Sequence, residues 1–468
     1  MKTSRLSLGF IAGAAVFLCV ATPHAGRANP DPKPSIPMES GTPAPAGGHG
    51  LAASPASSAG VQEPSGELTL RQALEVGLAG NPDLAVFSWE ARSGDPRIQQ
   101  AGLIPNPELG IEFENFLGSE PSRKFETLET TLSISQLVEL GGKRAARIRL
   151  ASSEKEVSNW DYEAKRADVA AEVAKAFVEV LSAQERSALA GEMARLAKEV
   201  LDVVSARVTA GKISPVEETK ASVAWSISRI DLERANLALE GARKRLAATW
   251  GSAKPMFSKA VGQLDRLTPI PPREVLADRI FRNPDVARWA AEIEQRKAVL
   301  AQDRAERIPN VTISAGIRRF REAEDTTFVA GATIPLPLFN RNQGKILESQ
   351  YRISKAESER AAAGNRVHAA LSDAYQALAA GYVEATTLKA VVLPGAQNAF
   401  EATNEGFRQG KFGYLEVLDA QRTLFEARGR YVEALGAYHK AVVDTERLIG
   451  GELGEPVISI QTDLGSTR

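Results

Sequence analysis

The stretch LSDAYQALAAGYVEATTLKAVV, residues 371–392, decides the fold of this chain. Its apolar and aromatic side chains recur at spacings of four and three residues, at Leu371, Tyr375, Leu378, Tyr382, Ala385 and Val392. This spacing keeps one seam of an α-helix against a neighbouring helix. The helical pattern runs from Gly344 to Gln409, and Pro394 is expected to bend it. At 1.5 Å per residue such a helix is about 100 Å long, wider than a compact globular domain.

A sharp turn at Gly410-Lys411 ends this helix, and a second helix returns to Arg447. The returning helix carries its own seam, at Tyr431, Leu435, Tyr438 and Val442. The two seams predict a long antiparallel hairpin of helices.

An earlier copy of this hairpin lies about 200 residues upstream. Its first helix runs from Gly142-Lys143 to a turn at Gly211-Lys212, just as the later one runs from Gly344-Lys345 to Gly410-Lys411. The seams expected for its two helices are Leu189, Met193, Leu196, Val200 and Val203, then Val223, Ile227 and Ile230. Two further motifs recur at nearly the same offset, Asn81-Pro82-Asp83 as Asn283-Pro284-Asp285 and Ile104-Pro105-Asn106 as Ile308-Pro309-Asn310. The chain is therefore predicted to be internally duplicated, with repeats over 68–270 and 271–450.

Several helix starts are visible in the sequence. Asn81 and Asn283 each precede a proline and an aspartate, which predicts helices over 81–103 and 283–307. Thr69 and Gln72 suit a capping box for a short helix through 78, and Ser214 with Glu217 suits another at the start of the returning helix.

Between the short and long helices of each repeat the periodicity changes to two. Leu109, Ile111 and Phe113 alternate with Glu112 and Glu114, and similar alternation continues in three later segments. The four expected strands are 108–116, 128–134, 311–318 and 328–334, joined in pairs by polar loops at 118–124 and 319–326. Soluble hairpins with one buried face are one interpretation. The strand lengths of about ten residues favour a membrane barrel with acids turned inward, and four strands require that several chains share it.

The N-terminal sequence predicts that the chain is exported from the cytoplasm. Residues 1–28 have the charged start, apolar centre and small-residue end of an export signal, and 29–66 form a Pro/Ala/Gly-rich segment expected to be a disordered linker. The only cysteine, Cys19, follows bulky residues rather than the small ones of a lipoprotein signal. The chain has 57 Lys and Arg against 58 Asp and Glu, so no nucleic-acid partner is indicated. Residues 67–450 form the expected ordered part, and 451–468 a tail.

No catalytic, cofactor or metal site is visible in the sequence. His368 and His439 lie on helices without a second histidine three or four residues away, and they are expected to be structural or surface residues. No phosphate loop, nucleophile elbow or paired-carboxylate signature is present, so an enzyme is not predicted.

At these residues the chain resembles the TolC family of outer-membrane efflux channels. Four motifs are similar to its cobalt-zinc-cadmium resistance branch: Pro105-Asn106-Pro107-Glu108-Leu109, Glu129-Thr130-Thr131, Glu139-Leu140-Gly141-Gly142-Lys143-Arg144 and 335–344. The resemblance implies a mainly α-helical homotrimer. Its long helical hairpins would form an α-barrel in the periplasm, and four strands from each protomer would form a twelve-stranded membrane β-barrel in outer-membrane lipid.

The resemblance also implies where an entrance gate lies. In the family, acids just after the second turn constrict the periplasmic entrance, and Glu416 and Asp419 occupy matching positions, with Glu217 after the first turn. Lys212 and Lys411 depart from the family pattern beside the turn glycines Gly211 and Gly410. Helix capping is the alternative role for these acids.

The expected function is passive conduction of cargo in a tripartite efflux system. The implied partners are a periplasmic adaptor protein and an inner-membrane resistance-nodulation-division pump, and the implied cargo is heavy-metal cations such as cobalt, zinc, cadmium or nickel. Drugs or other small organic molecules are the alternative cargo. A periplasmic adaptor or a structural coiled coil are the alternative classes, but neither accounts for two hairpins together with membrane-like strands.

Overall fold

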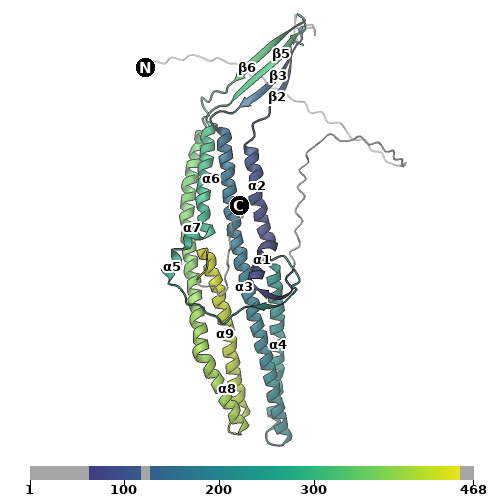
Figure 1. Cartoon of the computed structure of the whole chain (residues 1–468), viewed down its shortest axis with the longest axis vertical. Coiled ribbons are helices and arrows are strands. Elements are labelled where there is room, and N and C mark those ends of the chain that lie inside the picture. The colour runs from purple at the N-terminus through teal and green to yellow at the C-terminus, as the bar shows by residue number, and fades with distance from the viewer. Residues whose placement is uncertain (1–62, 117–126, 454–468) are drawn as a thin grey trace, which may run out of the picture. The chain divides into compact units, whose positions relative to one another are not determined.

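The computed structural model describes residues 63–116 and 127–453, which all belong to one compact unit (Figure 1). The export signal, most of the linker, the loop expected at 118–124 and most of the tail lie outside these residues. The elements are, in order, β1 Gly66–Thr69, α1 Leu70–Gly80, α2 Pro82–Ala101, β2 Glu108–Glu114, β3 Glu129–Val138, α3 Lys143–Thr209, α4 Pro215–Ala248, β4 Phe257–Val261, α5 Arg273–Ala277, the 3-10 helix η2 Ile280–Arg282, α6 Pro284–Glu306, β5 Val311–Phe320, β6 Asp325–Thr333, α7 Gln343–Thr387, the π-helical η3 Leu388–Val392, α8 Leu393–Arg408 and α9 Tyr414–Ile449.

Four of the strands form one antiparallel sheet in the order β2-β3-β5-β6. The two predicted hairpins are therefore present, and β3 pairs with β5 to join the two halves of the chain. The loop expected at 319–326 is shorter, because β5 continues through Phe320 and β6 begins at Asp325. Strands β2 and β6 are left at the two edges of the sheet.

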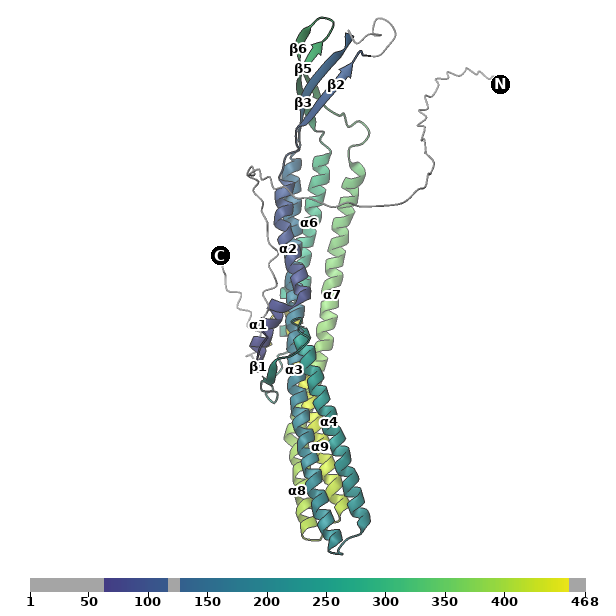
Figure 2. The same ribbon diagram turned by 90° about the vertical axis from the view of Figure 1, so that its right-hand side faces the viewer.

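The two long hairpins are α3 with α4, and α7 and α8 with α9. Figure 2 shows α3, α4, α8 and α9 side by side at the end of the unit away from the sheet. The long helix expected from Gly344, with a bend at Pro394, is divided by η3, which ends two residues before Pro394. A π turn takes one extra residue and rotates the side chains that follow. Leu371 and Leu378 are buried as predicted, but Val392 leaves the seam and is 39% exposed.

The seam predicted for α4 is wrong. Val223, Ile227 and Ile230 are all more than half exposed, whereas Ala221 and Ser228 are buried. Small side chains line this face because they let two helix backbones approach closely, which leaves the larger apolar side chains on the outside.

The main core surrounds the middle of α3. Val173, Phe177 and Leu246 are almost completely buried there, beside Leu68 of β1 and Phe257 of β4. Strands β1 and β4 pair in parallel, although the sequence predicted only loop at 251–272 and placed Gly66 in the linker. These strands were missed because each is only four or five residues long and shows no alternation.

Two buried asparagines join helices end to end. The side chain of Asn81 accepts a hydrogen bond from Leu84 N at 2.9 Å, as a predicted N-cap should, and donates to Thr249 O at the end of α4 at 2.8 Å. Asn283 caps α6 in the same way through Asp285 N at 2.7 Å and donates to Leu448 O at the end of α9 at 2.9 Å. Each asparagine thus satisfies an N–H at one helix start and a C=O at another helix end.

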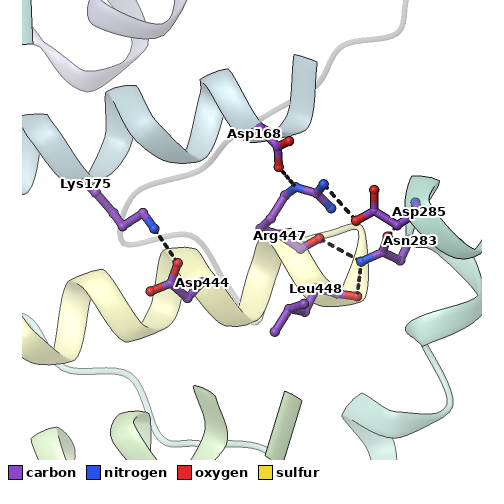
Figure 3. Close-up of polar contacts among 7 residues, drawn as sticks. All are labelled: Asp168, Lys175, Asn283, Asp285, Asp444, Arg447 and Leu448. Carbon is purple, nitrogen blue, oxygen red and sulfur yellow. Dashed lines mark hydrogen bonds and ion pairs between the residues drawn. The ribbon is translucent and has the colours of Figure 1, made fainter. Parts of the chain in front are cut away.

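Charged side chains reinforce the second joint (Figure 3). Arg447 of α9 contacts Asp168 of α3 at 2.7 Å and Asp285 of α6 at 2.9 Å. One turn earlier, Asp444 pairs with Lys175 of α3 at 2.5 Å. The end of α9 is therefore held to both repeats.

A partly buried carboxyl group lies next to this joint. Glu446 Oε1 accepts a hydrogen bond from Leu453 N at 3.0 Å, just beyond the end of α9. Burial, with a smaller contribution from Glu452, raises the pKa of Glu446 to about 7 against the opposing effects of the Leu453 hydrogen bond and Arg279.

We expect Asn283→Ala to destabilise the protein by about 2 to 4 kcal/mol, because it removes an N-cap and leaves a buried carbonyl unpaired. Asn283→Ser retains a capping oxygen and should cost roughly half as much. Denaturant unfolding in detergent measures both values. An Asn283→Ser variant as stable as the parent protein would show that the bridge to Leu448 contributes nothing, and equal costs for the two variants would show that the cap contributes nothing.

Glu446 predicts a pH-dependent stability. Its folded pKa lies above the ordinary value of 4.5, so its stabilising contribution is complete below about pH 4.5 and is lost as the pH rises through about 7. Glu446→Gln should match the parent protein at pH 4.5 and exceed its stability at pH 8 by up to about 3 kcal/mol. Exposed Glu433→Gln on the same helix is the control and should show no such difference. A pH-independent effect of Glu446→Gln would contradict the assignment.

Candidate functional site

The two hairpins end in matching turns. Gly211 and Gly410 have positive φ values of 68° and 76°, a conformation that glycine adopts without strain. Lys212 N donates to Arg207 O at 2.9 Å, and Lys411 N donates to Gly406 O at 2.8 Å. These bonds satisfy carbonyls at the ends of α3 and α8. The predicted turn residues therefore lie at equivalent places in the two repeats.

Glu217 does not complete the capping box that the sequence predicted. Ser214 Oγ accepts instead from Val216 N at 3.3 Å, and Glu217 pairs with Lys220 at 3.0 Å. Glu217 is half-buried and close to Tyr414 of the other hairpin. Burial, with the nearby Glu217 carboxylate, raises the pKa of the Tyr414 hydroxyl.

Glu416 and Asp419 are both exposed in the first turns of α9. One carboxylate oxygen of Glu416 lies beside Gly413, but no side chain caps the start of α9 by a hydrogen bond. Lys212 and Lys411 are also exposed, and none of these four residues forms an ion pair within the described ranges. Within one chain, the acids and the turn lysines are therefore free to meet other groups.

Residues that the sequence analysis did not single out hold the two tips together. Val204 and Ala221 of the first hairpin pack against Phe407, Tyr414 and Val417 of the second. Arg207 crosses the same contact. Its guanidinium lies 4.3 Å from the centroid of the Phe407 ring, and its Nη2 donates to Phe407 O at 3.3 Å. The only sequence signal for Arg207 was a cation in the last turn of a helix.

The sheet has one strongly acidic face. Its register places five acids and one arginine on this face: Glu108, Glu112, Glu114, Glu129, Asp325 and Arg318. Arg318 contacts Glu114 at 2.9 Å and Glu129 at 3.3 Å. The formal charge of the face is therefore −4, with one cation bridging two neighbouring strands.

The opposite face is apolar, and nothing within residues 63–116 and 127–453 covers it. Rows of paired positions cross the sheet, such as Ile111, Leu132, Ile317 and Phe328. All four side chains are more than 40% exposed, and Phe328 is 92% exposed. Water on both sides would leave this face without a compensating contact. The alternation predicted from the sequence is confirmed.

The described residues contain no group of three or more His, Cys, Asp and Glu side chains arranged to hold a metal ion. His439 is a buried structural residue whose Nε2 lies 2.8 Å from Leu264 O, and burial lowers its pKa. His368 is exposed. In this part of the chain, no helix is both long and apolar enough to cross a bilayer.

Known proteins resemble the chain over most of its length. It is 40% identical to the cobalt-zinc-cadmium resistance protein CzcC of Cupriavidus metallidurans, over 83% of this chain and 91% of that protein. It is 29% identical to the nickel-cobalt-cadmium resistance protein NccC of Alcaligenes xylosoxydans xylosoxydans, over 61% of this chain and 64% of that protein.

The fold is shared with a solved channel. The open state of the MtrE outer membrane channel of Neisseria gonorrhoeae superposes with a TM-score of 0.68 at 17% identity, covering 83% of this chain and 91% of that one. The family described as outer membrane efflux protein matches residues 73–252 and 276–451. Both the fold and the family are those of channels that extend from the outer membrane into the periplasm. The chain therefore belongs to the outer membrane efflux protein family.

Proposed function

We propose that this protein is the outer-membrane channel of a tripartite pump that exports heavy-metal cations. The observation that carries the proposal is the 40% identity to a cobalt-zinc-cadmium resistance protein across 91% of that protein. Cobalt, zinc, cadmium or nickel ions are the cargo, and the channel conducts them passively.

Three copies would share one barrel. In the described part of one copy the four-stranded sheet has unpaired edges at β2 and β6, and lipid does not tolerate open edges. Three such sheets make twelve strands, with the apolar faces in lipid and the acidic faces toward a water-filled lumen. Cargo cations would then pass three copies of a face that carries a charge of −4, which favours cations over anions.

The remaining parts have distinct roles in this proposal. Residues 1–28 direct export, 29–65 act as a linker, and the ordered part from about 66 to 450 forms the channel from two repeats, followed by a tail. The helical hairpins would form an α-barrel in the periplasm and meet an adaptor protein and an inner-membrane resistance-nodulation-division pump.

The hairpin tips would form the entrance. Glu416 and Asp419 are exposed and without an ion pair in the described chain, so three copies would bring six carboxylates around one axis. Glu217 is less suited to such a ring, because it is half-buried and already paired with Lys220. Lys212 and Lys411 are placed to pair with acids of neighbouring hairpins.

A deletion strain tests the cargo. Loss of the gene should increase sensitivity to cobalt, zinc, cadmium or nickel salts and leave sensitivity to a panel of organic drugs unchanged. Expression of the intact chain should restore growth. Sensitivity to drugs alone would replace the metal assignment with the alternative cargo.

Two neighbouring positions test the proposed barrel. Ile111→Arg places a cation in lipid and should cost about 2 to 4 kcal/mol, which should prevent insertion and trimer formation. Glu112→Arg is the matched control on the opposite face and should assemble normally. Membrane fractionation with heat-modifiable gel mobility gives the result, and equal tolerance of both variants would mean that the sheet does not lie in lipid.

The entrance acids are tested by conductance. The double variant Glu416→Ala and Asp419→Ala should reduce cation selectivity and weaken block by trivalent cations in planar bilayers, because it removes the ring of negative charge. Trimer stability should hardly change. A capping role predicts the opposite pattern, with about 0.5 to 2 kcal/mol lost per cap and unaltered selectivity.

A further inference from the structure

The contact between the two repeats inside one chain provides a template for a contact between chains. At the end of the β3–β5 pair that faces the helices, the turn before α3 packs directly on the segment before β5. A Cβ atom at Gly141 would lie only 2.7 Å from the Cβ of Ile308, so these segments touch. Lys143 adds a hydrogen bond to Asn310 at 2.6 Å, and its side chain is 5% exposed.

The corresponding segments at the two edges of the sheet, before β2 and after β6, are exposed. Ile104-Pro105-Asn106 precedes β2 as Ile308-Pro309-Asn310 precedes β5, but Leu103 and Ile104 are 53% and 65% exposed. The loop after β6, residues 334–342, corresponds to the turn before α3. Its side chains Leu336, Leu338 and Phe339 are 74%, 64% and 90% exposed.

These two apolar segments cannot meet within one copy. The strand order β2-β3-β5-β6 places the segment before β2 and the loop after β6 at opposite edges of the sheet. Both segments lie at the same end of their strands, as do the two segments that touch below β3 and β5. An edge-to-edge pairing of β6 with β2 of another copy would bring them together.

We propose that the loop 334–340 is the docking surface for the segment Leu103–Asn106 of a second copy of this chain. The loop suits this role because Pro335 and Pro337 restrict its backbone and Leu338 N donates to Leu336 O at 2.9 Å, so little conformational freedom is lost on docking. The inference rests on the proposed multi-chain barrel and adds the surface that seals the ring where strands meet helices.

Cysteine cross-linking of the full chain in membranes tests the docking. The only natural cysteine is Cys19, in the proposed signal, so Ile104→Cys combined with Leu338→Cys introduces a single reactive pair. A short bismaleimide should convert the monomer band on a denaturing gel into cross-linked dimers and trimers. Neither single-cysteine variant should do so. Lys143→Cys with Asn310→Cys is the calibrating pair, and it should cross-link within one copy and remain monomeric in mass.

A second pair of variants distinguishes loss of docking from loss of folding. Leu338→Lys should reduce trimer yield, and adding Ile104→Glu should restore it, because opposite charges would then face each other across the contact.

The outcomes separate this inference from the proposed function. Trimers that form without any 104–338 cross-link would overturn the docking surface and leave the channel intact. The same conclusion would follow if the Leu338→Cys variant reacted only with a lipid-soluble maleimide. Absence of trimers from the unmodified protein would overturn both.

Discussion

The helix ends that meet in the middle of the unit constrain the whole structure. A helix end exposes backbone groups that no residue of the same helix can satisfy, and burying two such ends together is costly unless each group finds a partner. Asn81 and Asn283 solve the same problem in the two repeats, since one amide side chain serves both an N-terminus and a C-terminus. Glycines with positive φ complete the joints, because Gly251 lies against Pro82 and a Cβ at Gly450 would clash with the Arg282 carbonyl. Short helices can thereby continue the line of the returning long helices.

Much of this architecture could be predicted from local chemistry. The Asn-Pro starts, the Thr69–Gln72 capping box, the glycine turns and the alternation of β2, β3, β5 and β6 all depend on residues that are close in sequence. The failures depend on distant contacts. Strand β1 pairs with β4 across about 190 residues, and the π turn before Pro394 shifted Val392 out of a seam that ordinary spacing predicted. The prediction of a buried seam on α4 failed because residue spacing shows which apolar side chains share a helix face, but not whether that face packs against another helix of the same chain.

The candidate site was also predictable only in part, because some of its contacts join residues that are far apart in the sequence. The sequence located both turns and the acids after them, and it separated the acidic and apolar faces of the sheet. It did not show that Glu217 would pair with Lys220, or that Arg207 would lie against Phe407 two hundred residues away. Nor did it show that Arg318 would bridge two acids, which concentrates the uncompensated charge on the other carboxylates of the face. These features require the relative placement of separate helices and strands.

The outward face of α4 has a consequence for how the protein is made. Val216, Val223, Ile227, Ile230 and Leu237 are each more than half exposed, and they follow one another at the spacing of a helical stripe. On a single chain in water this apolar stripe is exposed, and it can bind any amphipathic helix that the chain meets. Correct assembly then competes with association with other proteins. The rate of correct assembly depends on how often copies of this chain collide, and the rate of wrong association depends on the concentration of other proteins nearby. Yield of the finished protein should therefore depend on the pace of synthesis and export, as well as on the stability of the final structure.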